Sequence, residues 1–218
     1  IHFIDEVLPG YFWLFPVKEG VVNVGCGMLI SEQRKQRGKK KSLKQIQRWV
    51  IEEHPGFKKR FANATLVPKS EKGWQLPFGS PRKKAPSYQP RRVAMAGAMA
   101  VGDAASLVDP FSGEGIGNAL LTAKMTSRHF DKEMHSGGFP EDGAVAYMEE
   151  MWDELGSELT NSKTLQSLMK WKRVTNWFIK KASKKEEIGK MMSEMIASKE
   201  AQKALWNPWF MFKTLILP

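Results

Sequence analysis

The sequence predicts a mixed fold of the α/β (α+β) class, and three segments support that prediction. An apolar run at 93–101 indicates a buried strand, which passes through a glycine-rich turn into a helix that starts near Asn118. Runs rich in aromatic and β-branched residues at 9–16 and 21–28 flank a Lys-Glu-Gly turn, a pattern typical of an antiparallel hairpin. From Asp142 onward the composition favours helix almost continuously.

The segments between these elements are shorter and more polar. Apolar residues recur at helical spacing over 43–50, and a Pro-Gly pair at 55–56 ends the helix that they predict. Two β-like pieces at 65–67 and 74–76 are expected to extend the sheet of the hairpin. A stretch rich in Pro and Lys at 81–90 is interpreted as a link between subdomains.

The turn between the strand and the helix, at 101–118, is the main candidate for a ligand site. It holds three glycines at alternating positions, Gly113, Gly115 and Gly117. A strand that turns into a helix directs backbone N–H groups and the positive end of the helix dipole at whatever lies above the turn. Glycines permit close approach of a flat ligand, and Asp103 could accept hydrogen bonds from ligand hydroxyls. The simpler alternative is a glycine-rich turn in which Asp103 caps its own loop, but the length of the pattern favours a ligand.

A family resemblance rests on this stretch, which runs Gly-Asp-Ala-Ala, then Asp-Pro, then Gly-Glu-Gly-Ile. It resembles the second flavin-binding motif of FAD-dependent oxidoreductases of the geranylgeranyl reductase family, relatives of the aromatic hydroxylases. The resemblance implies that Asp103 contacts the ribityl and pyrophosphate part of FAD and that the Pro-to-Gly-Ile turn lies against the flavin ring. The cofactor-binding residues that it implies are Gly102, Asp103, Pro110, Gly113, Gly115, Ile116 and Gly117.

The aromatic residues of the first strand suggest a second site. Alternation places Tyr11, Trp13 and Phe15 on one face of the strand, and Phe12 and Leu14 on the other. Both faces are apolar, so we expect both to be covered, one by protein core and the other by core or by an apolar ligand. The pattern Tyr-x-Trp-x-Phe-Pro is similar to the substrate-pocket motif of geranylgeranyl reductases, which implies that Tyr11, Trp13 and Phe15 line the channel of a lipid substrate. Tyr11 has the only hydroxyl in this row and is therefore the candidate proton donor.

The formal net charge of +11 is concentrated in clusters at 34–44, 82–84 and 170–190. Such clusters suit nucleic acid, an anionic membrane surface, or simply a solvated face. No motif of a nucleic-acid-binding fold accompanies them, so nucleic acid is the weaker hypothesis. The mixed apolar and basic pattern at 165–185 fits an interfacial amphipathic helix and a bundle helix with a wet face equally well. The apolar tail at 205–218 is expected to pack on the protein body, a partner or a membrane.

Cysteine and histidine usage argues against disulfides and metals. Cys26 is the single cysteine, which excludes an intrachain disulfide, suits a reducing compartment, and is interpreted as a small buried residue or a pocket thiol. His129 and His135 lie six positions apart, so we assign no metal role. No apolar run approaches the ~20 residues of a membrane span. We therefore expect a cytoplasmic, peripherally membrane-associated protein.

The sequence lacks a Gly-x-Gly-x-x-Gly motif that follows a strand, the element that holds the adenosine half of a dinucleotide. Because that element opens members of the family, the resemblance implies the C-terminal part of an FAD-binding Rossmann-type flavoprotein, with an antiparallel substrate-domain sheet and a helical C-terminal region. The part that binds the adenosine half of FAD would then be an upstream segment missing from this sequence or a separate polypeptide. We expect weak or no FAD binding by this chain alone. The predicted domains are a substrate-binding sheet region (1–80), the second part of the FAD-binding domain (81–135) and a helical region (136–218).

The function that the resemblance implies is FAD-dependent reduction of carbon–carbon double bonds in a polyprenyl, geranylgeranyl-type chain of a lipid or quinone. NADPH or a ferredoxin-type donor would reduce the flavin again. Three alternatives remain: a flavin monooxygenase or epoxidase acting on an apolar substrate, a non-catalytic fragment that binds a membrane surface, and a nucleic-acid-binding protein. Oxygen consumption, vesicle binding without flavin, and salt-sensitive retention on DNA would distinguish them.

Overall fold

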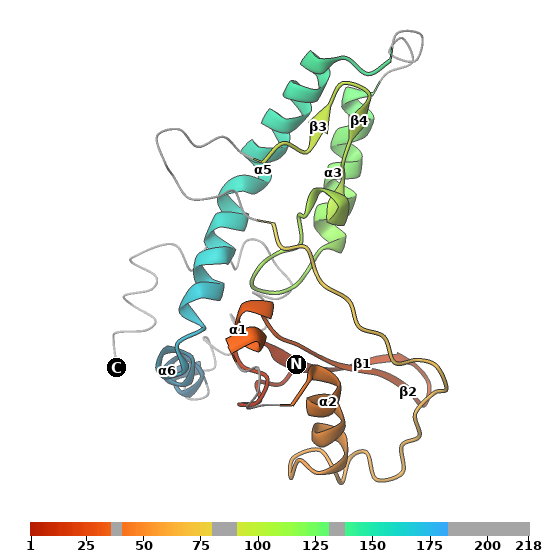
Figure 1. The fold of residues 1–218 in the computed structure, drawn as a ribbon, viewed down its shortest axis with the longest axis vertical. Helices are drawn as coiled ribbons and strands as arrows, with labels where there is room; N and C mark the ends of the chain where they lie inside the picture. The colour runs from red at the N-terminus through yellow and green to blue at the C-terminus, as the bar shows by residue number, and fades with distance from the viewer. Residues whose placement is uncertain (36–40, 80–90, 131–137, 183–218) are drawn as a thin grey trace. The chain divides into compact units, whose positions relative to one another are not determined.

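A computed structural model describes residues 1–35, 41–79, 91–130 and 138–182 of the 218-residue chain (Figure 1). The chain divides into two compact units, Ile1–Gly73 and Trp74–Pro218. Short antiparallel sheets and helices make up the described part, so the fold is α+β. Several predicted features lie outside the described residues: the middle of the first basic cluster (36–40), the second basic cluster, the 81–90 link, His135, the lysines after 182 and the apolar tail.

The first unit is built on the predicted hairpin. Strand β1 (Tyr11–Lys18) pairs antiparallel with β2 (Val21–Gly27), and Trp13 lies opposite Gly25. The turn between them contains Gly20, whose φ of 68° lies in the left-handed region that favours glycine. The hairpin prediction is therefore confirmed.

The core of the first unit lies on one face of this hairpin. Phe12 is fully buried and packs edge-on against Phe57, with 5.1 Å between ring centroids. Two short helices follow the hairpin, α1 (Ile30–Lys35) and α2 (Leu43–Glu52). Helix α2 begins with a capping box between Ser42 and Gln45 and contributes Ile46 and Val50 to the same cluster. The helix predicted over 43–50 is thus confirmed.

The second unit departs from the sequence-based expectation at its start. The run at 93–101 is not one strand but a small hairpin of β3 (Ala94–Met95) and β4 (Ala98–Met99). Gly97 turns the chain with a φ of 80°, and its N–H donates to the Phe139 carbonyl at 2.8 Å. The pieces at 65–67 and 74–76 form no strand, so the expected extension of the hairpin sheet is wrong.

Helices form most of the described remainder of the second unit. A 3₁₀ turn, η1 (Gly102–Ala105), leads through the glycine-rich turn to α3 (Ile116–His129), and then come α5 (Glu141–Leu168) and α6 (Lys172–Ala182). Helix α5 packs along α3 (Figure 1). Its buried side chains recur every three or four residues, which defines one apolar face. The fully buried members of that face include Tyr147, Met151 and Leu155. Over the described part of the chain, no helix is both long enough and apolar enough to cross a membrane.

Cys26 behaves as a partly buried thiol rather than a reactive one. Its Sγ donates to the Leu43 carbonyl at 3.5 Å, and burial raises the pKa of the thiol from an ordinary 9.0 to about 11. At pH 8 the thiolate fraction is then about 100-fold lower than in the unfolded chain. We expect iodoacetamide to label Cys26 about 100-fold more slowly in the native protein than in denaturant, as followed by mass spectrometry. Equal rates in both states would contradict this prediction.

Candidate functional site

The aromatic row of β1 is ordered on the hairpin face opposite the core. Tyr11 and Trp13 meet edge-on with 6.0 Å between ring centroids, and Trp13 and Phe15 stack at 6.2 Å. The Trp13 indole N–H also donates to the Asn23 side-chain oxygen at 2.7 Å. Phe15 is 46% exposed, whereas Phe12 on the opposite face has no exposed surface. The alternation is confirmed, and the row presents a preorganised, partly open apolar surface.

Glycines shape the strand beneath this row. A Cβ at Gly25 would lie 2.1 Å from the Trp13 ring, so the missing side chain makes room for the indole. A Cβ at Gly10 would lie 1.9 Å from the Gly27 carbonyl oxygen, which shows a close backbone approach there. Gly10 is therefore required by a close approach of two backbone segments, and Gly25 by the position of the Trp13 ring. The sequence analysis missed Gly25 and Asn23 as supports of Trp13, because cross-strand partners depend on the register.

The glycine-rich turn brings Asp103 next to Gly115. Asp103 is exposed in η1, and within the described residues its carboxylate has no hydrogen-bond partner. A Cβ on Gly115 would lie 3.1 Å from Asp103 Oδ1 and 3.2 Å from Val108 Cγ2. Glycine at position 115 thus leaves room for the side chains of Asp103 and Val108. Gly113 has a φ of 76°, a turn requirement that glycine meets without strain.

A buried carboxylate organises the middle of the turn. Asp109 Oδ1 accepts hydrogen bonds from the N–H of Phe111 at 3.0 Å, the N–H of Ser112 at 2.7 Å and the Ser112 hydroxyl at 2.8 Å. Its other oxygen, Oδ2, is buried and has no partner within the described chain. Such an atom is rare in proteins and marks a place where a donor from a ligand or water would be stabilising. The sequence analysis did not include Asp109 among the site residues.

Helix α5 holds the same turn from the other side. Gln166 donates through Nε2 to the Pro110 carbonyl, and the Phe111 N–H donates to the Ser162 hydroxyl at 3.0 Å. Both side chains are buried, and they lie four residues apart on one face of the helix. No local pattern could have revealed them, because they are separated from the turn by about fifty residues of sequence.

The N-terminus of α3 already holds a carboxylate. Gly115 is the N-cap residue and makes no side-chain capping bond, but Glu114 Oε1 accepts from the Gly117 N–H at 2.6 Å. Negative charge at a helix N-terminus is stabilising. One of the amides expected to face a ligand is therefore engaged with the protein itself, while Ile116 is 77% exposed beside it.

These features fit a flavin cofactor of the kind that the sequence implies. Asp103 offers an exposed carboxylate that could accept hydrogen bonds from sugar hydroxyls. Asp109 Oδ2 is a buried acceptor without a donor, and the start of α3 offers the positive end of a helix dipole. The turn belongs to the second unit and the aromatic row to the first. Within the described residues, no three or more His, Cys, Asp and Glu side chains gather as a metal site would require.

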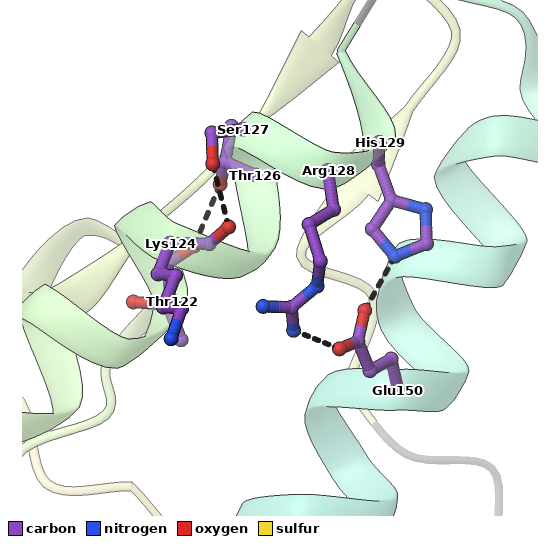
Figure 2. Close-up of polar contacts among 7 residues, drawn as sticks. All are labelled: Thr122, Lys124, Thr126, Ser127, Arg128, His129 and Glu150. Carbon is purple, nitrogen blue, oxygen red and sulfur yellow. Dashed lines mark hydrogen bonds and ion pairs between the residues drawn. The ribbon is translucent and has the colours of Figure 1, made fainter.

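The other end of α3 carries an ionic cluster, in which Arg128 and His129 converge on Glu150 of α5 (Figure 2). Arg128 Nη2 pairs with Glu150 Oε1, and His129 Nε2 lies 2.6 Å from Glu150 Oε2. The His129 ring also meets Tyr147 edge-on at 5.9 Å, and the Tyr147 hydroxyl donates to the Ala100 carbonyl at 2.9 Å. His129 is therefore part of a structural cluster that joins α3 to α5.

This cluster makes stability depend on pH. Hydrogen bonds from His129 and then from Arg128 lower the pKa of Glu150 in the native protein. The ionised Glu150 therefore contributes to the free energy of unfolding above the ordinary glutamate pKa of 4.5, and this contribution is lost as the pH falls through the lower native pKa. Because Glu150 is partly exposed, we expect Glu150→Gln to cost only about 0.5 kcal/mol at pH 7, and the difference should shrink as the pH falls below 4.5. Urea titrations across this range measure it. Glu149→Gln, at an exposed neighbouring position, is the control and should show no such convergence.

The part of the chain that holds the aromatic row is similar to a known protein family. Residues 2–66 match the geranylgeranyl reductase catalytic domain. The chain is 31% identical over 180 residues to a digeranylgeranylglycerophospholipid reductase of Methanococcus aeolicus, a match that covers 83% of this chain and 39% of the relative. The chain belongs to the geranylgeranyl reductase family. The resemblance inferred from the sequence is thereby confirmed.

Other relatives of the family carry two different names. A digeranylgeranylglycerophospholipid reductase of Thermoplasma volcanium is 31% identical over 138 residues, which is 63% of this chain and 30% of the relative. A menaquinone reductase of Mycobacterium tuberculosis is 31% identical over 125 residues, 57% of this chain and 27% of the relative. The chain thus spans roughly a third of the length of these curated relatives. No solved structure matches it significantly.

Proposed function

We propose that this chain contributes a substrate surface and a flavin-binding turn to an FAD-dependent reductase of carbon–carbon double bonds in polyprenyl chains. The observation that carries the proposal is the aromatic row of Tyr11, Trp13 and Phe15, which is ordered, partly exposed and separated from the core by the strand itself. It lies within the segment that matches the family's catalytic domain. Relatives named as reductases of a geranylgeranyl lipid and of menaquinone both support a polyprenyl chain as substrate.

The glycine-rich turn would hold the flavin in a Rossmann-type domain, with Asp103 at the sugar hydroxyls and the start of α3 at the electron-rich edge of the ring. When bound, FAD would supply the hydride for the alkene after reduction by NADPH or a ferredoxin-type donor. The chain's own residues would bind and orient: the aromatic row excludes water and aligns the prenyl chain, and the α3 dipole stabilises negative charge. Tyr11 is the proposed proton donor, from its phenolic O–H to the alkene carbon that does not receive the hydride.

We further propose that a second element, upstream in the coding sequence or on a separate polypeptide, binds the adenosine half of FAD. The absence of a Gly-x-Gly-x-x-Gly motif from the 218 residues supports this proposal. This chain alone should then retain little or no flavin. Prenyl lipids and prenylated quinones reside in membranes, so we also expect the protein to meet a lipid surface.

The visible absorption spectrum after incubation with FAD and desalting tests the proposal. A protein extended by the upstream coding sequence should retain a flavin spectrum, while the 218-residue chain should not. Asp103→Ala in the extended protein should weaken retention, and Asp153→Ala, at an exposed position of α5, should leave it unchanged. Absence of flavin from the extended protein would contradict the assignment of the turn.

Tyr11→Phe tests the proton donor. In the extended, flavin-loaded protein under anaerobic conditions, we expect turnover of a prenyl substrate to fall by roughly 10²–10⁴-fold, as is typical of a lost general acid, with little change in KM. Tyr11→Phe keeps the ring that meets Trp13, so packing is retained. Full activity of the variant would exclude Tyr11 as the donor, and oxygen consumption coupled to substrate would favour a monooxygenase instead.

A further inference from the structure

The corner where α5 ends and α6 begins exposes an apolar side chain at every third position. The exposed fractions are 48% for Leu168, 71% for Trp171, 38% for Val174 and 44% for Trp177. Backbone hydrogen bonds from the Trp171 N–H to the Leu168 carbonyl and from the Val174 N–H to the Trp171 carbonyl, at 3.1 and 2.8 Å, place these positions on successive helical turns. Residues three apart on such turns are surface neighbours. We call these four residues the corner surface.

The opposite side of α6 is the one that packs on the protein. Thr175 is 1% exposed, and its hydroxyl donates to the Met169 carbonyl at 2.9 Å. Thr175 is one residue from Val174 and two from Trp177, so it points in a different direction from both. Trp171 lies four residues before Thr175, on the same side at the first turn of the helix, but its side chain is 71% exposed. Val174 and Trp177 therefore do not lie on the inward face of α6, and Leu168 and Trp171 are exposed at the corner itself, so burial of α6 does not explain the apolar character of these four residues.

Positive charge surrounds the corner surface. Lys170 and Arg173 are exposed between its members. From 159 to 185 the sequence has no carboxylate, and its cations are Lys163, Lys170, Lys172, Arg173, Lys180, Lys181, Lys184 and Lys185. Burial and then the nearby charge of Lys170 lower the pKa of Lys163. An anionic surface would complement this charge.

We propose that the corner surface docks on an anionic lipid bilayer, with the two tryptophans at the headgroup level and Lys170 and Arg173 against lipid phosphates. Tryptophans favour that interface because their rings are apolar and their N–H groups polar, and basic side chains extend toward the headgroups. A nucleic acid would satisfy the cations but would leave Leu168 and Val174 in water. The lipid surface is the partner that uses both the apolar and the charged side chains. The proposal rests on the lipid-surface contact expected under the proposed function and assigns that contact to particular residues, while its test uses neither flavin nor a prenyl substrate.

Sedimentation of the 218-residue chain with vesicles tests the apolar part of the contact. We expect binding to vesicles that contain phosphatidylglycerol and weak binding to pure phosphatidylcholine. The double substitution Trp171→Ala and Trp177→Ala should weaken binding roughly tenfold or more, since two large apolar surfaces are lost. Trp74→Ala is the matched control, because Trp74 is 88% exposed but lies outside the corner surface. Equal binding by the double variant and the wild-type chain would overturn the proposal.

The charged part is tested by Lys170→Gln and Arg173→Gln. Each removed cation should weaken binding to anionic vesicles roughly fivefold, and added salt should reduce that difference. Lys124→Gln, at an exposed position of α3, should have no comparable effect. All substituted side chains are exposed, so thermal unfolding should be unchanged and loss of binding cannot be ascribed to misfolding. Retention on double-stranded DNA without vesicle binding would assign the corner to nucleic acid and overturn the proposal.

Discussion

Gly102→Ala should lower the free energy of unfolding of the second unit by about 2–5 kcal/mol. Gly102 has a φ of 52°, where an alanine costs about 1–2 kcal/mol. A Cβ there would also lie 2.7 Å from the Ala119 Cβ and 3.1 Å from the Ala119 Cα, so η1 would have to move away from α3. Overpacking of that kind costs about 1–3 kcal/mol more. Hydrogen exchange of α3 and α5 amides measures the loss within this unit.

A matched glycine separates the two causes. Gly97 has a φ of 80° but nothing within 4 Å of the position of a Cβ, so Gly97→Ala should cost only the backbone part. Ala119→Gly, combined with Gly102→Ala, removes the closest contact and should recover part of the overpacking cost in a double-mutant cycle. Equal losses for Gly97→Ala and Gly102→Ala would show that the predicted contact with α3 does not matter.

Phe12→Ala should destabilise the first unit by about 3–5 kcal/mol, the usual range for removing a fully buried phenylalanine. The ring has no exposed surface and packs against Phe57, so its loss leaves a cavity between the hairpin and α2. Hydrogen exchange of the hairpin amides should rise, while that of α5 stays unchanged because α5 belongs to the other unit.

Phe15→Ala is the companion test, three positions along the same strand. Phe15 is 46% exposed, so its removal should change stability by less than about 0.5 kcal/mol. It should instead weaken binding of a prenyl substrate to the flavin-loaded protein, because Phe15 stacks on Trp13 at the end of the aromatic row. A stability loss as large as that of Phe12→Ala would mean that the exposed face is part of a core.

The elements that the sequence predicted correctly have strong local signals. Aromatic and β-branched runs around a Lys-Glu-Gly turn predicted the hairpin, helical spacing predicted α2, and a helix-favouring composition predicted α5. The run at 93–101 misled because small apolar residues suit a buried strand, yet Gly97 in its middle takes a positive φ and reverses the chain. The triplets at 65–67 and 74–76 were too short to form strands without a partner to pair with.

The residues of the candidate site also differ in how far the sequence predicted them. Alternation was sufficient to place Tyr11, Trp13 and Phe15 together, because period two is a property of any strand. The supports of the glycine-rich turn were not predictable, since Ser162 and Gln166 reach it only after α5 has packed in the second unit. Contacts between residues so distant in sequence depend on tertiary packing and leave no periodic signal.

The C-terminal end of α5 also fixes the distance between the glycine-rich turn and the corner surface. Gln166, which holds the Pro110 carbonyl, precedes Leu168 of the corner surface by two residues, an axial rise of about 3 Å. If the corner surface rests on a bilayer, helix α5 would therefore hold the glycine-rich turn at a constant height above the headgroups. A single inserted residue between Gln166 and Leu168 would rotate the corner by about 100° relative to the turn while hardly lengthening the helix.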